Sequence, residues 1–188
     1  MGCQHNIRTG TVYNWTCDYC GFKGGIIKVS EDTVLKTLNP KVYLVDMDGT
    51  IADASHRLHT IQNLPKDWKA FYELSKDDSP IYEVLRVVQG LEAVGHHIFI
   101  VTGRSEECRE GTVSWLIRND VPWLWLYMRK EGDHREDFIV KSELLDKLLK
   151  ESGLQLSDIG GAFEDRQQVV DMYRERGIKV FQVAKGNF

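Results

Sequence analysis

Two aspartates separated by one residue, Asp46 and Asp48, are the part of this 188-residue sequence with the clearest capacity for chemistry. They directly follow the apolar run "KVYLV" (41–45), which is typical of a buried strand. Because burying an unpaired charge is unfavourable, the pair needs a cationic partner, a metal ion or a catalytic role. Asp-Gly also forms ordinary turns, so the pair taken alone has a purely structural alternative.

Further polar residues occur where other apolar segments end or helical patterns begin. They are Thr102, Gly103, Arg104, Lys141, Glu164 and Asp165. Taken alone, each has an ordinary explanation: a strand-to-helix turn with Ser105 as N-cap, a solvated helix lysine, or carboxylates at a helix N-terminus. Ligands of parallel sheets bind at the carboxyl ends of the strands, where these residues would meet. Their order along the chain therefore favours one shared site.

Short apolar segments alternate with amphipathic helical patterns from about residue 40 onward. The segments expected to form strands are 41–45, 97–101, 123–127, 160–163 and 179–183. Helical spacing of apolar residues over 81–94 and 144–149 predicts helices between them, with Gly95 and Gly177 ending helices. The alternation predicts an α/β fold with a parallel sheet flanked by helices. We expect the aromatic run 123–127 to lie in the core.

The segment between the first two strands is too long for a single crossover and predicts a small flap, or cap, over the site. Pro65 and Asp67 can begin a helix that runs to about Leu74. The aromatic residues on or near one face of this helix are Trp68, Phe71 and Tyr72.

Composition places the chain among ordinary globular proteins, with 42% hydrophobic and 28% charged residues. A net charge of −4 excludes a global basic field, so nucleic-acid binding would need a local patch. No apolar run approaches the roughly 20 residues that span a membrane, and residues 1–10 lack a signal-peptide pattern. We therefore expect a cytoplasmic protein without a membrane partner; the sequence indicates no protein partner or oligomeric state.

Four motifs resemble those of the haloacid dehalogenase superfamily of phosphotransferases: "DMDGT", "VTGR", Lys141 and "EDRQQVVD". Longer stretches are most similar to the phosphatase domain of bacteriophage polynucleotide kinase-phosphatases. They are "DWKAFYELSKDDSP", "MRKEGDHREDFIVKSELL" and "AFEDRQQVVDMYRERGIKVFQVAKGNF". The resemblance covers residues 40–188 and implies a Rossmann-like phosphatase domain. The fourth motif reads Glu-Asp where Asp-Asp is usual in the superfamily.

These motifs fit the hydrolysis of a phosphomonoester in two steps. Asp46 is the expected nucleophile, which would form an acyl-phosphate. Asp48 would protonate the leaving alkoxide and then deprotonate the attacking water. Thr102 would contact the phosphoryl oxygens, and Lys141 would neutralise the phosphate and the nucleophile together.

A magnesium ion is the expected cofactor, because two carboxylates would otherwise repel a phosphate dianion. Its expected ligands are Asp46, the backbone carbonyl of Asp48, and either Glu164 or Asp165. The resemblance also implies substrate-binding roles for Arg57, Gly103 and Asp137, the last by orienting Lys141, and a catalytic role for Arg104.

The substrate expected from the resemblance is a 3′-phosphate on a nucleic-acid end, and a free nucleotide is the alternative. A local basic rim would favour a polymer: His56, Arg57, Arg129, Lys130, His134 and Arg135. No G-x-x-x-x-G-K-[ST] motif occurs in the sequence, so we expect no kinase domain in this chain. An alternative of a different class is a zinc-containing binding module with a catalytically silent fold.

The first 30 residues predict a separate zinc-ribbon-like segment. Cys3, His5, Cys17 and Cys20 form two close pairs of ligands suited to tetrahedral zinc. In a reducing compartment such clustering favours a metal over a disulfide. An extension with incidental cysteines and no metal is the alternative.

Protein purified without chelator should therefore hold about one zinc ion, because four ligands complete a structural site. Replacing Cys17 and Cys20 by serine should release it while hydrolysis of small phosphomonoesters survives. Elemental analysis of both proteins checks this, and a wild-type protein without zinc would contradict the assignment.

Overall fold

The computed structural model describes residues 14–16, 23–25, 39–62 and 64–186, and the chain divides into two units, Met1–Asn39 and Pro40–Phe188. In the first unit, β1 (Asn14–Thr16) pairs antiparallel with β2 (Lys23–Gly25). The expected zinc ligands Cys3, His5, Cys17 and Cys20 lie outside the described residues.

The second unit is built on a five-stranded sheet in the order β7-β6-β3-β8-β9, in which all neighbouring strands are parallel. The strands are β3 (Val42–Val45), β6 (His97–Ser105), β7 (Trp125–Arg129), β8 (Ile159–Glu164) and β9 (Val180–Gln182). All five predicted strands are confirmed, although β7 begins two residues later than expected. The chain reverses its direction of progress across the sheet beside β3, the place where parallel sheets bind ligands.

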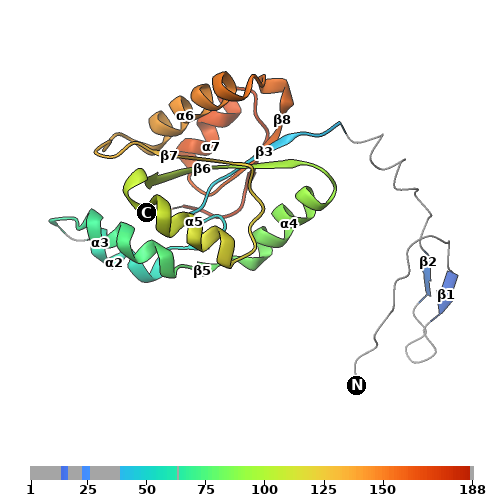
Figure 1. Ribbon diagram of the computed structural model, residues 1–188, viewed down its shortest axis with the longest axis horizontal. Helices are drawn as coiled ribbons and strands as arrows, with labels where there is room; N and C mark the ends of the chain where they lie inside the picture. Colours follow the sequence, from blue (N-terminus) through green and yellow to red (C-terminus); the bar gives the residue numbers. More distant parts are fainter. Residues whose placement is uncertain (1–13, 17–22, 26–38, 63, 187–188) are drawn as a thin grey trace. The chain divides into compact units, whose positions relative to one another are not determined.

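Helices cover both faces of the sheet, as the alternating pattern predicted (Figure 1). The helices α6 (Asp137–Ser152) and α7 (Gln167–Glu175) lie on one face; α4 (Tyr82–Ala93) and α5 (Arg109–Arg118) lie on the other. Short 3₁₀ turns precede α5 (Glu106–Cys108) and β8 (Leu156–Asp158). Gly95 and Gly177 have φ values of 93° and 82°, which glycine adopts without strain where a helix ends.

Alternation along β3 divides the core into two halves. Val42 and Leu44 pack in the cluster with α6 and α7, whereas Val45 and Met47 pack with α4 and α5. Both faces of β3 are therefore buried, as expected for a central parallel strand. This leaves the carboxyl end of the strand, where Asp46 and Asp48 follow, as the place for polar groups.

The expected flap lies between β3 and α4. It contains two short 3₁₀ turns (Ser55–Arg57 and Leu74–Asp77), α2 (His59–Gln62) and α3 (Trp68–Glu73), and β4 (Ala52–Asp53) pairs antiparallel with β5 (Ser79–Pro80) at its base. Asp67 caps α3, as predicted, because its carboxylate accepts a hydrogen bond from the amide of Ala70 at 2.9 Å.

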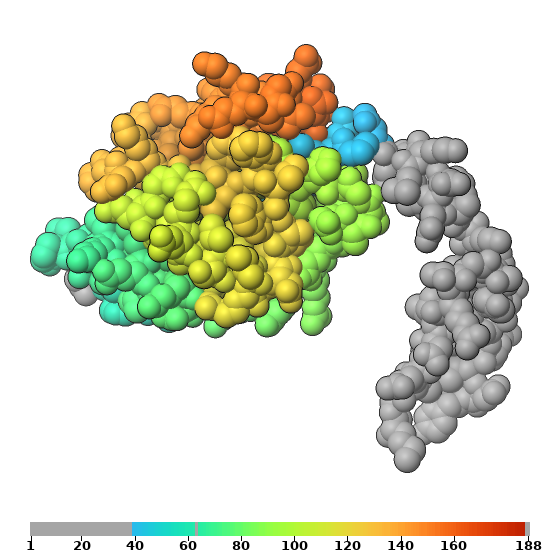
Figure 2. Space-filling view, viewed as in Figure 1, coloured from blue at the N-terminus to red at the C-terminus, as the bar shows by residue number. Residues whose placement is uncertain are grey.

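The expectation that the aromatic run 123–127 is core is wrong for its first three residues. Trp123, Leu124 and Trp125 are 36%, 56% and 45% exposed, while Leu126 and Tyr127 are buried. Trp123 and Leu124 lie in the connection before β7, and Trp125 begins β7, which is an edge strand of the sheet; local hydrophobicity reveals neither position. The segment lies on the surface in Figure 2 (yellow).

Trp115 of α5 connects the helical layer to the base of the flap. Its side chain is fully buried, and its indole Nε1 donates a hydrogen bond to the carbonyl oxygen of Asp78 at 2.7 Å.

No helix in the described part of the chain has the length and apolar character to cross a membrane.

Replacing Trp115 by phenylalanine should lower the free energy of unfolding by about 1–3 kcal/mol, because the buried carbonyl of Asp78 loses its indole donor. Urea unfolding followed by circular dichroism measures the change. Trp125→Phe, at an exposed position, is the matched control and should shift the value by no more than about 0.5 kcal/mol. Equal effects of the two substitutions would contradict the role given to Trp115.

Candidate active site

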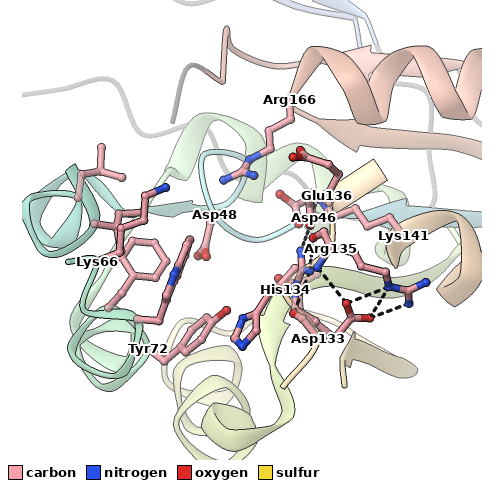
Figure 3. Close-up of a pocket in the computed structure, with 18 of the residues that line it drawn as sticks. Asp46, Asp48, Lys66, Tyr72, Asp133, His134, Arg135, Glu136, Lys141 and Arg166 are labelled. Atoms are coloured by element: carbon pink, nitrogen blue, oxygen red, sulfur yellow. Dashed lines mark hydrogen bonds and ion pairs between the residues drawn. The ribbon is translucent and has the colours of Figure 1, made fainter. Parts of the chain in front are cut away.

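A cavity of about 590 Å³ opens at the carboxyl end of β3. Its walls include Asp46, Asp48, Thr102, Gly103, Asp137 and Lys141. Figure 3 shows Lys66 and Tyr72 of the flap on one side, Asp133 and Arg135 on the opposite side, and Asp48 between them. The tertiary structure thus brings together, around one cavity, most of the residues that the sequence placed at strand ends.

Lys141 is the cationic centre of the cavity floor. Its Nζ lies 2.8 Å from Asp46 Oδ1, 2.8 Å from Glu164 Oε2 and 3.3 Å from Asp137 Oδ2, and the side chain is 1% exposed. Burial alone would lower the pKa of Lys141, but the three carboxylates raise it well above its ordinary value. The lysine is therefore charged, and it holds β3, α6 and β8 together.

The buried groups around Lys141 include more carboxyl groups than cations. Four carboxylates (Asp46, Asp137, Glu164 and Asp165) face two buried cations, Lys141 and Arg129. Burial, together with neighbouring carboxylates, raises the pKa of Asp46 to about 8, that of Glu164 to about 7 and that of Asp165 to about 6. A divalent cation would offset the mutual repulsion of these carboxylates and favour their ionised forms.

The donor set fits such a cation. Oxygen atoms of Asp46, Glu164 and Asp165 lie within 4.8 Å of one another. Both carboxylate oxygens of Asp165 are buried and have no hydrogen-bond partner among the residues that the structure describes. Glu164, in contrast, accepts from Lys141 Nζ and from the amides of Asp165 and Arg166. A metal ion bound here would supply the partner that the buried oxygens of Asp165 lack.

The carboxyl group of Asp48, unlike that of Asp46, lies beside cations that lower its pKa. Its Oδ1 accepts hydrogen bonds from Arg57 Nη2 at 2.6 Å and from Arg104 Nε at 2.8 Å. Burial alone would raise the pKa of Asp48, but Arg104 and Arg57 lower it to about 2. The carboxylate is therefore ionised in this state of the protein. Neither arginine lines the cavity: both side chains are fully buried behind Asp48.

Asp78 completes this network and was not singled out from the sequence. Its buried carboxylate accepts from Arg57 Nε at 2.8 Å, from Arg57 Nη2 at 2.8 Å and from Arg104 Nη2 at 2.5 Å. Two carboxylates thus neutralise two guanidiniums, which makes their burial tolerable. The only sequence signal was indirect, because two site arginines require counterions and Asp48 supplies only one.

Arg129 is the second residue whose role the sequence did not indicate. It was expected in a basic rim, but it is 8% exposed and binds the carbonyl of Gly103 at 2.9 Å and Asp137 Oδ1 at 2.8 Å. Arg135 is paired with Asp133 and Glu143. With Arg57 also buried in ion pairs, the expected rim is largely neutralised within the protein.

Thr102 and Gly103 lie within the last part of β6, where its pairing with β7 is irregular, and Gly103 is packed tightly against Asp137 at the start of α6. Thr102 is fully buried, and its Oγ1 accepts from the amide of Arg104 at 3.2 Å. A Cβ atom at position 103 would collide with the carboxylate of Asp137, so only glycine allows this approach. Gly103 therefore lets Asp137 sit between Arg129 and Lys141.

Comparison with known proteins supports a phosphatase. A family model described as "Polynucleotide kinase PNKP phosphatase domain" matches residues 40–188. One chain of the Pnkp1/Rnl/Hen1 complex is similar, with 28% identity, a TM-score of 0.62, and coverage of 81% of this chain and 48% of that chain. A chain of a second structure, described as the Pnkp1/Rnl/Hen1 RNA repair complex, has the same identity and TM-score and is covered over 44%. This chain thus spans about half the length of these two.

More distant structures share the fold. The class C acid phosphatase from Bacillus anthracis is 14% identical, with a TM-score of 0.57 over 84% of this chain and 72% of that chain. A haloacid dehalogenase-like hydrolase from Streptococcus pneumoniae is 11% identical, with a TM-score of 0.57 over 76% of this chain and 84% of that chain. The haloacid dehalogenase-like α/β fold predicted from the sequence is confirmed.

The three raised carboxyl pKa values predict an unusual pH dependence of stability without metal. Between pH 4 and 8 the folded protein binds protons that the unfolded chain has already lost, so the free energy of unfolding should fall as pH rises. The thermal midpoint in chelator should be lower at pH 8 than at pH 6. Magnesium should raise it more at pH 8, because fewer protons compete for the ligands.

Asp165→Asn provides the control for this prediction. It removes one of the repelling carboxylates, so the fall between pH 6 and 8 and the gain from magnesium should both become smaller. Asp171→Asn, at an exposed position of α7, should behave as the wild type. A wild-type midpoint that rises from pH 6 to pH 8 in chelator would contradict the prediction.

Proposed function

The chain belongs to the family of polynucleotide kinase PNKP phosphatase domains, and we propose that it removes the 3′-phosphate from nucleic-acid ends through an aspartyl-phosphate intermediate. Its membership of a phosphatase-domain family makes it a phosphoric monoester hydrolase. The observation that carries the proposed mechanism is the buried Asp46–Lys141 contact at the carboxyl end of β3.

Asp46 is the proposed nucleophile. A carboxylate oxygen of Asp46 attacks phosphorus, the bond between phosphorus and the 3′-oxygen breaks, and an acyl-phosphate forms. Lys141, 2.8 Å from Asp46 Oδ1, neutralises the approaching phosphoryl group while Asp137 and Glu164 hold the ammonium in position. Thr102 and Gly103, which line the cavity beside Asp46, are proposed to contact the phosphoryl oxygens.

Asp48 is the proposed proton-transfer residue. In the first step its protonated form gives a proton to the leaving 3′-oxygen; in the second it takes a proton from the water that attacks the acyl-phosphate. The low pKa of Asp48 favours its ionised form, which takes the proton from water. The negative charge of a bound phosphate would raise this pKa and so favour the protonated form that gives a proton to the 3′-oxygen. Arg57 and Arg104 are proposed to position Asp48 instead of contacting substrate, since both lie buried behind it.

Magnesium is the proposed cofactor, with Asp46, Asp165 and the backbone carbonyl of Asp48 as ligands. The orphaned oxygens of Asp165 support its choice over Glu164, whose oxygens are already engaged by Lys141 and by backbone amides. When bound, the cation would offset the charge that develops on the phosphoryl oxygens. Glu164 is proposed to orient Lys141, whose Nζ donates a hydrogen bond to its carboxylate.

Arg166 is a further candidate for phosphate contact. It lines the cavity from the start of α7, and Figure 3 shows its guanidinium reaching over the cavity above Asp48. An arginine fork in this place suits phosphate oxygens, which accept two parallel hydrogen bonds.

A nucleic-acid end is the proposed substrate because the family is named for polynucleotide kinase PNKP and the neighbours at 28% identity are Pnkp1 chains, one within an RNA repair complex. The flap is small, which leaves room for a polymer. Since Arg57, Arg129 and Arg135 are engaged within the protein, binding should depend less steeply on salt than a fully basic rim would imply. A free nucleotide remains the alternative substrate.

A silent binding module is disfavoured by the assembled cavity, because a fold without catalysis has no need of the buried cluster of carboxyl groups around Lys141. Two other proposals rest on the sequence alone. They are structural zinc on Cys3, His5, Cys17 and Cys20, and a cytoplasmic location.

The wild-type enzyme with magnesium should hydrolyse a 3′-phosphorylated oligonucleotide faster than its 5′-phosphorylated counterpart, by about tenfold or more. Asp46→Asn should lower the rate on the 3′-phosphate by at least about 10³-fold, because an amide cannot form the acyl-phosphate. Initial rates of phosphate release measure both effects.

Asp171→Asn, an exposed aspartate of α7, is the matched control and should keep the wild-type rate. Near wild-type activity of folded Asp46→Asn would disprove the nucleophile assignment. Equal rates on the two oligonucleotides, or faster turnover of free nucleotides, would favour the nucleotidase alternative.

A further inference from the structure

The cavity is much larger than the group whose transfer it is proposed to catalyse. A water molecule occupies about 30 Å³ of liquid, and a phosphoryl group amounts to only a few such volumes, whereas the cavity measures about 590 Å³. That size lies within the range of about 300–1,000 Å³ found for sites that enclose a whole organic ligand. Most of the cavity is therefore available to the part of the substrate that carries the phosphate.

The side of the cavity formed by the flap is apolar and aromatic, unlike the charged floor. Leu58, Ile61, Trp68 and Tyr72 all line it. The rings of Trp68 and Tyr72 are stacked, with centroids 6.1 Å apart and planes inclined by 29°. Trp68 is 39% exposed, and Figure 3 shows Tyr72 directed toward the cavity. A broad aromatic surface is thus presented where a ligand can reach it.

This surface is supported from behind. Phe71 is 5% exposed and meets Trp68 edge-to-face at 5.8 Å. The guanidinium of Arg57 lies 4.0 Å from the centroid of the Phe71 ring, and the same group binds Asp48. The aromatic wall is therefore anchored to the residue proposed to transfer protons, which preorganises it for a flat ligand beside the reacting phosphate.

We propose that Trp68 and Tyr72 form a stacking site for the nucleobase of the terminal nucleotide, the one that carries the 3′-phosphate. The proposal rests on the proposed function, because it places the phosphate of that nucleotide at Asp46. A single sugar ring joins base and phosphate, so a base on the flap wall and a phosphate on the cavity floor suit one nucleotide. Stacking tolerates every base, because each has an aromatic face.

Lys66 extends the same surface. Its Nζ lies 5.5 Å from the centroid of the Trp68 ring, and the side chain lines the cavity. Figure 3 shows it on the flap side, across the cavity from the cluster of Asp133 and Arg135. A cation in this position suits the phosphodiester that links the terminal nucleotide to the rest of the strand.

Two 3′-phosphorylated oligonucleotides test the proposal. They are identical except that one ends in an ordinary nucleotide and the other in a tetrahydrofuran residue, which keeps the sugar and the phosphate but lacks the base. The wild type should show a higher kcat/KM for the first oligonucleotide, by roughly 5- to 150-fold, the range that base stacking supports. Trp68→Ala should abolish most of this difference by lowering the value for the base-bearing substrate alone.

Two further variants make the readout specific. Trp68→Phe should retain much of the preference, because it keeps an aromatic face. Trp125→Ala, a similarly exposed tryptophan on β7 outside the cavity, should leave both substrates at wild-type rates. Thermal midpoints show whether each variant is folded. An equal loss on both oligonucleotides in folded Trp68→Ala, or a wild type without preference for the base, would overturn the stacking site.

Failure of the proposed function is distinguishable from failure of the stacking site. If the wild type hydrolyses neither oligonucleotide, the proposed function fails. The stacking site is then judged by the Kd values of both oligonucleotides for Asp46→Asn, with and without Trp68→Ala. A tighter Kd for the base-bearing oligonucleotide that depends on Trp68 supports the site, and equal Kd values overturn it.

Discussion

The burial of one ammonium group among carboxylates is the interaction on which the rest of this site depends. Lys141 is almost fully buried, and it contacts carboxylates that follow β3, begin α6 and end β8. Removing one partner of such a buried network leaves an uncompensated charge, at a cost of about 3–5 kcal/mol. The same contact therefore fixes three elements at one point and sets the charge of the cavity floor.

A second buried network differs from the first in its charge balance. Asp48 and Asp78 share Arg57 and Arg104, so this cluster has as many carboxylates as guanidiniums, whereas the cluster around Lys141 has more carboxyl groups than cations. The two environments push carboxyl pKa values in opposite directions: that of Asp48 falls and that of Asp46 rises. Such separation is what assigns different tasks to neighbouring carboxylates. Here it separates the proposed metal side of the cavity from the proposed proton-transfer side.

Much of the fold could be predicted from local patterns, because strands, helices and helix ends depend on periodicity and glycine. The five strands, α4 and the cap of α3 at Asp67 are examples. The exposure of Trp123 and Trp125 could not be predicted in this way. Trp123 precedes β7, and Trp125 begins it at the edge of the sheet. An apolar run does not reveal where its strand begins, and a strand looks the same in sequence at the centre and at the edge of a sheet.

The sequence by itself determined which polar residues lie at or near the carboxyl ends of the strands, and hence that Asp46, Thr102 and Asp165 lie at one edge of a parallel sheet. Only the tertiary structure decided the partners of each charge. It placed Arg57 and Arg129 in buried ion pairs instead of on a basic rim, and it brought in Asp78, which accepts a hydrogen bond from Arg104, 26 positions away in the sequence. The physical reason is that the partner and the pKa of a buried charge depend on burial and distance, which arise when elements far apart in the chain pack together.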